Sequence, residues 1–233
     1  MTAAAPAAGY RGVIFDMDGI VADTEHLWDA SWTAFARRHG TDWTHTDSVR
    51  LQGMSVPEWA AQLASDSGVP EKAVEAARSC VDFIVRAVGD GDGQLIDGAA
   101  ELIGYAAQRV PVALATSSDR RIIDTLLAAR GVDHWFSATV SSAEVDRGKP
   151  SPDVYLEAAR RIGVDGRPAI GIEDSGNGIR AAHGAGLYTI AIPNRQFPPD
   201  AQALAVADHV AADHADALSH LRLLLPTDPC RTR

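Results

Sequence analysis

Hydrophobic residues follow a helical rhythm in the first part of the chain. After a short apolar stretch at residues 13–15, they recur every three to four positions with charged residues between them. This spacing predicts helices over residues 25–38, 56–67 and 71–88. Trp28, Trp32 and Trp59 fall at this spacing, which favours a place in the core of a small helical unit over a ligand cage.

From residue 95 onward the rhythm changes to short apolar stretches that alternate with amphipathic ones. With the stretch at 13–15, we expect strands over residues 111–115, 138–140, 169–172, 188–192 and 209–211. The helices expected between them cover residues 99–108, 120–129, 152–162, 178–184 and 215–225. Alternation of this kind predicts an α/β fold, a doubly wound, Rossmann-like parallel sheet with helices on both faces.

The helical unit is predicted to be an insertion into this α/β core. The run Gly89-Asp90-Gly91-Asp92-Gly93 is a flexible breaker, and residues 22–25 would be the outgoing connection. We therefore expect residues 1–22 and 94–233 to form the core and residues 23–93 to form an all-helical cap domain.

Composition narrows the classes of function. The chain has 233 residues and a formal charge of −10, which argues against general affinity for nucleic acid or an anionic membrane. Cys80 and Cys230 lie far apart, so neither a disulfide framework nor a zinc site is indicated, and a reducing cytoplasm is the simplest location. Residues 1–9 lack the features of a signal peptide and are expected to be a disordered lead-in. Oligomeric state is not readable from the sequence.

Polar side chains follow three of the predicted strands. They are Asp16 and Asp18, then Thr116, Ser117 and Ser118, then Glu173 and Asp174, with Lys149 between the last two groups. Because the carboxyl ends of parallel strands meet at one edge of a sheet, we expect these side chains to converge there. Carboxylates hold Mg²⁺, hydroxyls and backbone N–H groups hold phosphate oxygens, and a lysine offsets the charge of both.

Each of these residues also has a plain structural explanation. Thr116 alone is typical of a hydroxyl that caps the next helix, and Lys149 alone of a solvated surface lysine. Glu173 and Asp174 could form an acidic loop. Two acids at the end of a buried strand repel each other unless a cation or a shared proton lies between them, so the combination favours a functional site.

The order of the motifs resembles that of the haloacid dehalogenase superfamily, in the branch of aspartate-nucleophile phosphohydrolases with a helical cap. The resemblance rests on Asp16-Met17-Asp18-Gly19, then Thr116, then Lys149, then Glu173-Asp174, and it covers nearly the whole chain. It implies that Asp16 is a nucleophile that forms an aspartyl-phosphate and that Asp18 is the general acid and base.

The resemblance also implies how phosphate and metal are held. Thr116 and the backbone of Ser117 would hold the transferring phosphoryl group, and Lys149 would bridge that group and Asp16. Ser118 is a further candidate for binding the substrate. Mg²⁺ would be held by the Asp16 side chain, the Asp18 backbone carbonyl and Asp174, with Glu173 in the same acidic pair.

Within this superfamily, the pattern is most similar to β-phosphoglucomutase and the sugar-phosphate phosphatases. Leu51-Gln52-Gly53-Met54-Ser55 resembles their cap substrate loop, which makes Gln52 and Gly53 candidate substrate-binding residues. The chain departs from the mutase pattern where it has Trp28 in place of a histidine, Gln52 and Val56 in place of cations, and Asp119 in place of a lysine.

These departures favour a hydrolase, because a mutase must grip a second phosphate with cationic cap residues. We therefore expect a Mg²⁺-dependent phosphomonoesterase acting on a small phosphorylated metabolite such as a sugar or polyol phosphate. The alternatives are a β-phosphoglucomutase-type isomerase and a non-enzymatic, phospho-accepting or ligand-sensing module. The loop with Arg195 and Phe197 follows a predicted strand and is a candidate for the rim of the site.

Overall fold

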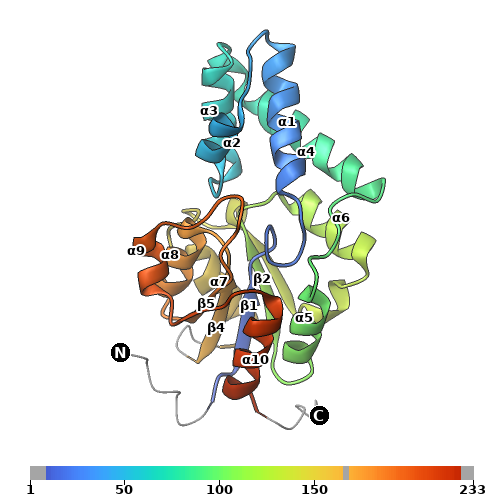
Figure 1. Ribbon diagram of the computed structural model, residues 1–233. Coiled ribbons are helices and arrows are strands. Elements are labelled where there is room, and N and C mark those ends of the chain that lie inside the picture. The colour runs from blue at the N-terminus through green and yellow to red at the C-terminus, as the bar shows by residue number, and fades with distance from the viewer. Residues whose placement is uncertain (1–8, 165–167, 227–233) are drawn as a thin grey trace.

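The computed structural model describes residues 9–164 and 168–226, and the core is a six-stranded parallel sheet (Figure 1). Residues 1–8 of the expected lead-in and Cys230 lie outside this part of the chain. The strand order is β3-β2-β1-β4-β5-β6. The strands are β1 (Gly12–Phe15), β2 (Val112–Thr116), β3 (Ala138–Ser141), β4 (Ala169–Glu173), β5 (Tyr188–Ala191) and β6 (His209–Val210). This sheet confirms the predicted fold class.

Both faces of the sheet are covered, because successive residues of a strand point to opposite sides. Val13 and Phe15 of β1 join one buried cluster, whereas Ile14 between them joins another. The first cluster is shared with α5 (Ala99–Ala107), α6 (Arg120–Arg130) and α10 (His214–Leu224), and the second with α7 (Asp153–Arg161) and α8 (Gly176–Gly184). A short helix, α9 (Ala201–Val206), packs on α8.

Four helices lie together beyond the carboxyl edge of the sheet (Figure 1). They are α1 (Glu25–Arg38), α2 (His45–Leu51), α3 (Val56–Asp66) and α4 (Ala73–Gly89). The two chain segments that join them to the core run side by side, with the Asp23 N–H donating to the Gln94 carbonyl at 2.9 Å. The boundaries of the cap domain, residues 23–93, stay a prediction.

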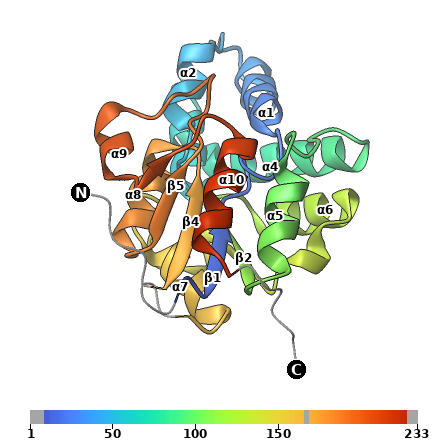
Figure 2. The same cartoon turned by 60° about the horizontal axis from the view of Figure 1, so that its bottom comes forward.

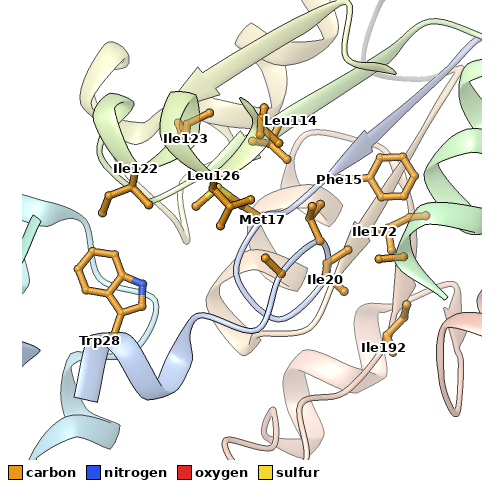
Figure 3. Close-up of a cluster of buried hydrophobic side chains, with 14 of the residues drawn as sticks. Phe15, Met17, Ile20, Trp28, Leu114, Ile122, Ile123, Leu126, Ile172 and Ile192 are labelled. Carbon is orange, nitrogen blue, oxygen red and sulfur yellow. The ribbon is translucent and has the colours of Figure 1, made fainter. Parts of the chain in front are cut away.

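The helical unit and the core share one continuous hydrophobic cluster. Figure 3 shows Trp28 of α1 in the same cluster as Phe15, Leu114 and Ile122 of the core. Arg130 of α6 adds polar contacts to the returning segment, the stretch of chain that leads from the end of α4 back to the core. Its guanidinium donates to the carbonyl of Gly93 at 3.0 Å and to the carbonyl of Asp92 in this segment. None of the helices in the described residues combines the length and the apolar character needed to cross a membrane.

The sequence pattern missed α2 and α9, and most of the other bounds agree with the prediction to within two residues. Helix α2 has only seven residues, and just Ser48 and Leu51 of them are buried, so it shows no apolar period. It is fixed by a capping box between Thr44 and Asp47. Helix α9 has six residues and begins after Asp200, whose side chain accepts from two backbone N–H groups.

Candidate active site at the carboxyl edge of the sheet

A cavity of about 380 Å³ lies where the helical unit faces the carboxyl edge of the sheet. Its floor carries Asp16, Asp18, Lys149 and Asp174. One wall comes from α1 and from the segment between α2 and α3. A second wall is the loop between β5 and α9, which reaches toward α2 in Figure 2.

Asp16 and Lys149 form a buried ion pair at the floor of this cavity. Asp16 follows the last residue of β1, and its carboxylate accepts a hydrogen bond of 2.6 Å from the Lys149 ammonium. Lys149 is only 4% exposed and reaches the site from the loop between β3 and α7. The same ammonium donates to Glu173 at 2.5 Å. One lysine therefore serves two carboxylates.

Glu173 is held by more donors than any other acid of the site. Its Oε1 accepts from Lys149 and from the Tyr155 hydroxyl at 2.9 Å, and its Oε2 accepts from the backbone N–H groups of Asp174 and Ser175 and from the Ser175 hydroxyl. The backbone of Gly178 lies so close that a Cβ there would be 1.7 Å from Glu173 Oε1. With five donors in place, Glu173 is built to position Lys149, and it offers little to a metal ion.

Burial and like charge perturb the acids at this floor. Burial and the neighbouring charge of Glu173 raise the pKa of Asp16 to about 8, although Lys149 acts in the opposite direction. Burial and Glu173 also raise the pKa of Asp174 well above its ordinary range. Burial alone would lower the pKa of Lys149, but Asp16 and Glu173 outweigh it, and the pKa is raised. The environment therefore favours the charged form of Lys149 and the neutral forms of Asp16 and Asp174.

These acids fit a divalent cation. Carboxylate oxygens of Asp16, Glu173 and Asp174 lie within 4.8 Å of one another, all buried. Among the described residues, no hydrogen-bond donor is paired with Asp16 Oδ2 or Asp174 Oδ1. Mg²⁺ binds oxygen ligands and is usually held by one or two carboxylates together with water, so carboxylate oxygens without a donor are suitable ligands. Of the acids that the sequence identified, Asp16 and Asp174 therefore fit a metal best.

Asp18 is turned toward the helical unit and is held by four donors. Its Oδ1 accepts from the hydroxyl of Thr24 and from the indole N–H of Trp28 at 3.1 Å. Its Oδ2 accepts from the hydroxyls of Ser118 at 2.8 Å and Thr116 at 3.3 Å. Thr24 directly precedes α1 and Trp28 belongs to it, whereas Thr116 ends β2 and Ser118 follows it, so Asp18 links the helical unit to the sheet.

The hydroxyl cluster after β2 is divided between two environments. The hydroxyls of Thr116 and Ser118 donate to Asp18, so in this structure they are already engaged. Ser117 lines the cavity, and its hydroxyl is buried without a hydrogen-bond partner among the described residues. Ser117 is therefore the member of the trio whose side chain is available to a ligand. Asp119, which stands where the mutase pattern has a lysine, caps α6 by accepting from the Arg121 N–H.

Two residues that the sequence did not identify as site residues connect the walls of the cavity to its floor. The Asn194 amide donates to Asp174 at 3.0 Å and to Glu25, the first residue of α1. Burial and then the charges of Asp18 and Asp23 raise the pKa of Glu25 to about 7. Asn194 follows β5, so its place at a strand end was the signal that could have identified it.

The cap residues and the loop after β5 are placed as follows. Gln52 and Gly53 line the cavity, as does Phe197, whereas Arg195 is exposed and does not. Trp28, Trp32 and Trp59 are buried in the helical unit, as expected, but they also line the cavity. The interpretation as core alone was therefore incomplete.

Comparison with known proteins gives the family relationships of the chain. Residues 10–186 match the model of the haloacid dehalogenase-like hydrolases. The chain is 33% identical over 200 residues to the bifunctional riboflavin kinase/FMN phosphatase of Arabidopsis thaliana. That match covers 85% of this chain and 52% of that protein, so the chain spans about half the length of this relative.

Two further matches extend over nearly the full length of the other protein. The validoxylamine A 7'-phosphate phosphatase of Streptomyces hygroscopicus subsp. limoneus is 32% identical over 209 residues, which cover 88% of this chain and 94% of that protein. A crystal structure of mutant CbbY from Rhodobacter sphaeroides in complex with xylulose-(1,5)bisphosphate matches with a TM-score of 0.79 and 26% identity. It covers 89% of this chain and 96% of that one.

Proposed function

Because the chain belongs to the haloacid dehalogenase-like hydrolases, as its motifs predicted, we propose that it is a Mg²⁺-dependent phosphomonoesterase. Its substrate is a small phosphorylated metabolite, a sugar or polyol phosphate, and the reaction passes through an aspartyl-phosphate on Asp16. The observation that carries the proposal is the buried pairing of Asp16 with Lys149 at 2.6 Å on the floor of a cavity.

The residues of the floor support a reaction in two displacements. A carboxylate oxygen of Asp16 attacks phosphorus, and the ester P–O bond breaks as Asp18 gives its proton to the leaving oxygen. A water molecule then attacks the aspartyl-phosphate while Asp18 takes its proton. The bond between phosphorus and Asp16 breaks, the electron pair returns to the carboxylate, and inorganic phosphate leaves.

Lys149 and the hydroxyl cluster supply electrostatic stabilisation. The Lys149 ammonium lies where it can offset the charge of a phosphoryl group on Asp16, and Glu173 holds it in that place. The hydroxyl of Ser117, which has no partner among the described residues, is suited to donate to a phosphoryl oxygen. Mg²⁺ held by Asp16 and Asp174 would supply charge neutralisation and Lewis-acid polarisation.

The alternative is a β-phosphoglucomutase-type isomerase, which must bind a second phosphate. Among the described residues that line the cavity, the cations are Lys149 and Arg180. Lys149 is paired with two acids, and Arg180 is paired with Asp200. This arrangement supports hydrolysis over the mutase reaction. Membership in a hydrolase family also argues against a non-enzymatic sensing module.

Phosphate release tests the proposal directly. The protein is assayed on a panel of sugar, polyol and nucleotide monophosphates, with Mg²⁺ or with a chelator, and Asp16→Asn serves as the blank. We expect release that requires both Mg²⁺ and Asp16. Conversion of glucose 1-phosphate to the 6-phosphate with a bisphosphate primer, without net hydrolysis, would favour the mutase. Release that persists in Asp16→Asn would refute the proposed nucleophile.

A further inference from the structure

One face of α1 presents three side chains to the cavity. Glu25, Trp28 and Trp32 are spaced at i, i+3 and i+7, which places them in a row on the same side of the helix. All three line the cavity. The row therefore extends from the carboxylate near Asp174 into the helical unit.

The donors of this row are used differently. The Trp28 indole N–H donates to Asp18, so it is committed to the floor of the site. Trp32 is only 2% exposed, and its indole N–H has no hydrogen-bond partner among the residues that the structure describes. The side-chain amide nitrogen of Gln52, on the same wall, is also buried and without a partner. Buried donors are rarely left unpaired in native proteins, so a ligand atom is the natural partner.

The position of Trp32 is rigidly defined. Its ring packs against Trp28, with centroids 5.7 Å apart, and against Trp59 at 6.0 Å. A donor on a ring fixed on two sides loses little freedom when a ligand binds, and it can therefore discriminate between ligands.

The charge of this wall indicates what kind of acceptor it takes. Trp32 and Gln52 are neutral donors, and Glu25 beside them is an acid. The cations that line the cavity within the described residues, Lys149 and Arg180, are already paired with acids. A second phosphate would meet no unpaired cation here, whereas the oxygen of a hydroxyl, ether or carbonyl group would find neutral donors.

We propose that Trp32 is a specificity-determining residue whose N–H donates to an uncharged oxygen on the leaving group of the substrate. Gln52 adds a second donor, and Glu25 accepts from a substrate hydroxyl. The proposal rests on the proposed phosphomonoesterase function and narrows it to monophosphates with a neutral, hydroxyl-bearing leaving group.

A pair of substrates and a pair of variants test this inference. Trp32→Phe removes the N–H and keeps an aromatic ring. The matched control is Trp43→Phe, because Trp43 is also buried in the helical unit but donates to Ser48 and does not line the cavity. Each variant is assayed for kcat and KM on glucose 6-phosphate and fructose 1-phosphate, and on phenyl phosphate, whose leaving group has no hydroxyl beyond the ester oxygen.

We expect Trp32→Phe to lower kcat/KM for the sugar phosphates by about 10- to 100-fold while phenyl phosphate changes far less. Trp43→Phe should leave unchanged the ratio of kcat/KM for the sugar phosphates to kcat/KM for phenyl phosphate. An equal loss on both kinds of substrate, or no loss on either, would overturn the role of Trp32. Hydrolysis of phenyl phosphate without any hydrolysis of sugar phosphates would overturn the substrate class, with the phosphomonoesterase function intact. If the wild type hydrolyses neither, the proposed function itself fails.

A second measurement needs no variant. The wild-type protein is assayed on the monodeoxy analogues of the better sugar phosphate, each lacking one hydroxyl. For at least one analogue, kcat/KM should be about 10-fold or more lower than for the parent sugar phosphate, because the missing hydroxyl leaves a buried donor of the protein unpaired. Equal rates for all analogues and the parent would contradict the proposal even if Trp32→Phe failed to fold.

Discussion

Lys149 and Asp16, 133 positions apart in the chain, meet in a buried hydrogen bond of 2.6 Å. The ammonium is shared with Glu173, so one buried cation is balanced against two acids. Removing one partner of a buried ion pair leaves an uncompensated charge, which costs far more than the net contribution of the intact pair. This pair therefore supports both the stability and the proposed chemistry of the molecule.

Lys149→Met should reduce both stability and activity. At neutral pH we expect the free energy of unfolding to fall by about 3–5 kcal/mol, since the buried Asp16 and Glu173 both lose the ammonium group that donates to them. Turnover should fall by about 10²- to 10³-fold. Denaturant unfolding and phosphate release measure the two effects. Lys72→Met, at the other lysine of the chain, removes an exposed ion pair with Glu75 and should change neither. Similar effects of both variants would contradict the role of Lys149.

Glu173 and Asp174 should differ in their effect on metal binding. Asp174→Asn removes a carboxylate with a free oxygen and should weaken Mg²⁺ binding strongly. Glu173→Gln should weaken it less and instead lower stability by about 1–3 kcal/mol, because an amide cannot accept all five hydrogen bonds. Calorimetric titration with Mg²⁺ measures the loss of metal affinity in each variant, and denaturant unfolding measures the loss of stability. An equal loss of Mg²⁺ affinity would make Glu173 a direct ligand.

Metal binding should release protons. Burial raises the pKa of Asp16 to about 8, so Asp16 is largely protonated near pH 6.5 in the metal-free protein, and burial and Glu173 shift the pKa of Asp174 in the same direction. Metal ligation needs the carboxylate form, so Mg²⁺ affinity should rise with pH up to about 8. Calorimetry in buffers of different ionisation enthalpy counts the protons. Asp16→Asn should release fewer, and absence of release in the wild type would show that these acids are already ionised.

The same shifts predict how stability depends on pH. An acid whose pKa is raised on folding stabilises the folded state below its ordinary pKa of about 4. That contribution to stability is lost as the pH rises toward the pKa of the acid in the folded state. The metal-free protein should therefore lose stability between about pH 4 and pH 8. Mg²⁺ should raise the melting temperature more at pH 8.5 than at pH 6, and a pH-independent increase would contradict the shifted values.

We propose that residues 23–93 move as a cap during turnover, and Gly91 offers a test. Its φ of +105° cannot be adopted by proline, and its N–H bonds the Val88 carbonyl. Gly91→Pro should lower kcat without unfolding the core. Gly68→Pro is the matched control, since Gly68 has φ +74° and an N–H bonded to Ser65 within the cap. If both variants keep full turnover, the returning segment is not a hinge.

The local pattern of the sequence determined the architecture. Apolar stretches of strand length alternate with amphipathic stretches of helical length, and this periodicity depends only on near neighbours. It indicated the parallel sheet, and the strand ends then indicated that Asp16, Thr116 and Asp174 share one edge. The first motif also includes Gly19, and the structure shows why a glycine stands there: a Cβ would lie 2.0 Å from Asp174 Oδ2, and φ is +80°.

Tertiary structure alone decided how these residues are paired. Lys149 and Tyr155 donate to Glu173, and Thr116 and Ser118 donate to Asp18. Asn194 joins Glu25 to Asp174. These contacts connect segments that are separate in the sequence. They depend on strand order and on how α1 packs over the sheet, which no local period encodes. Trp32 illustrates the limit: its helical spacing predicted burial, but only the packing of the helical unit determined that Trp32 also lines the cavity while its indole N–H has no partner among the described residues.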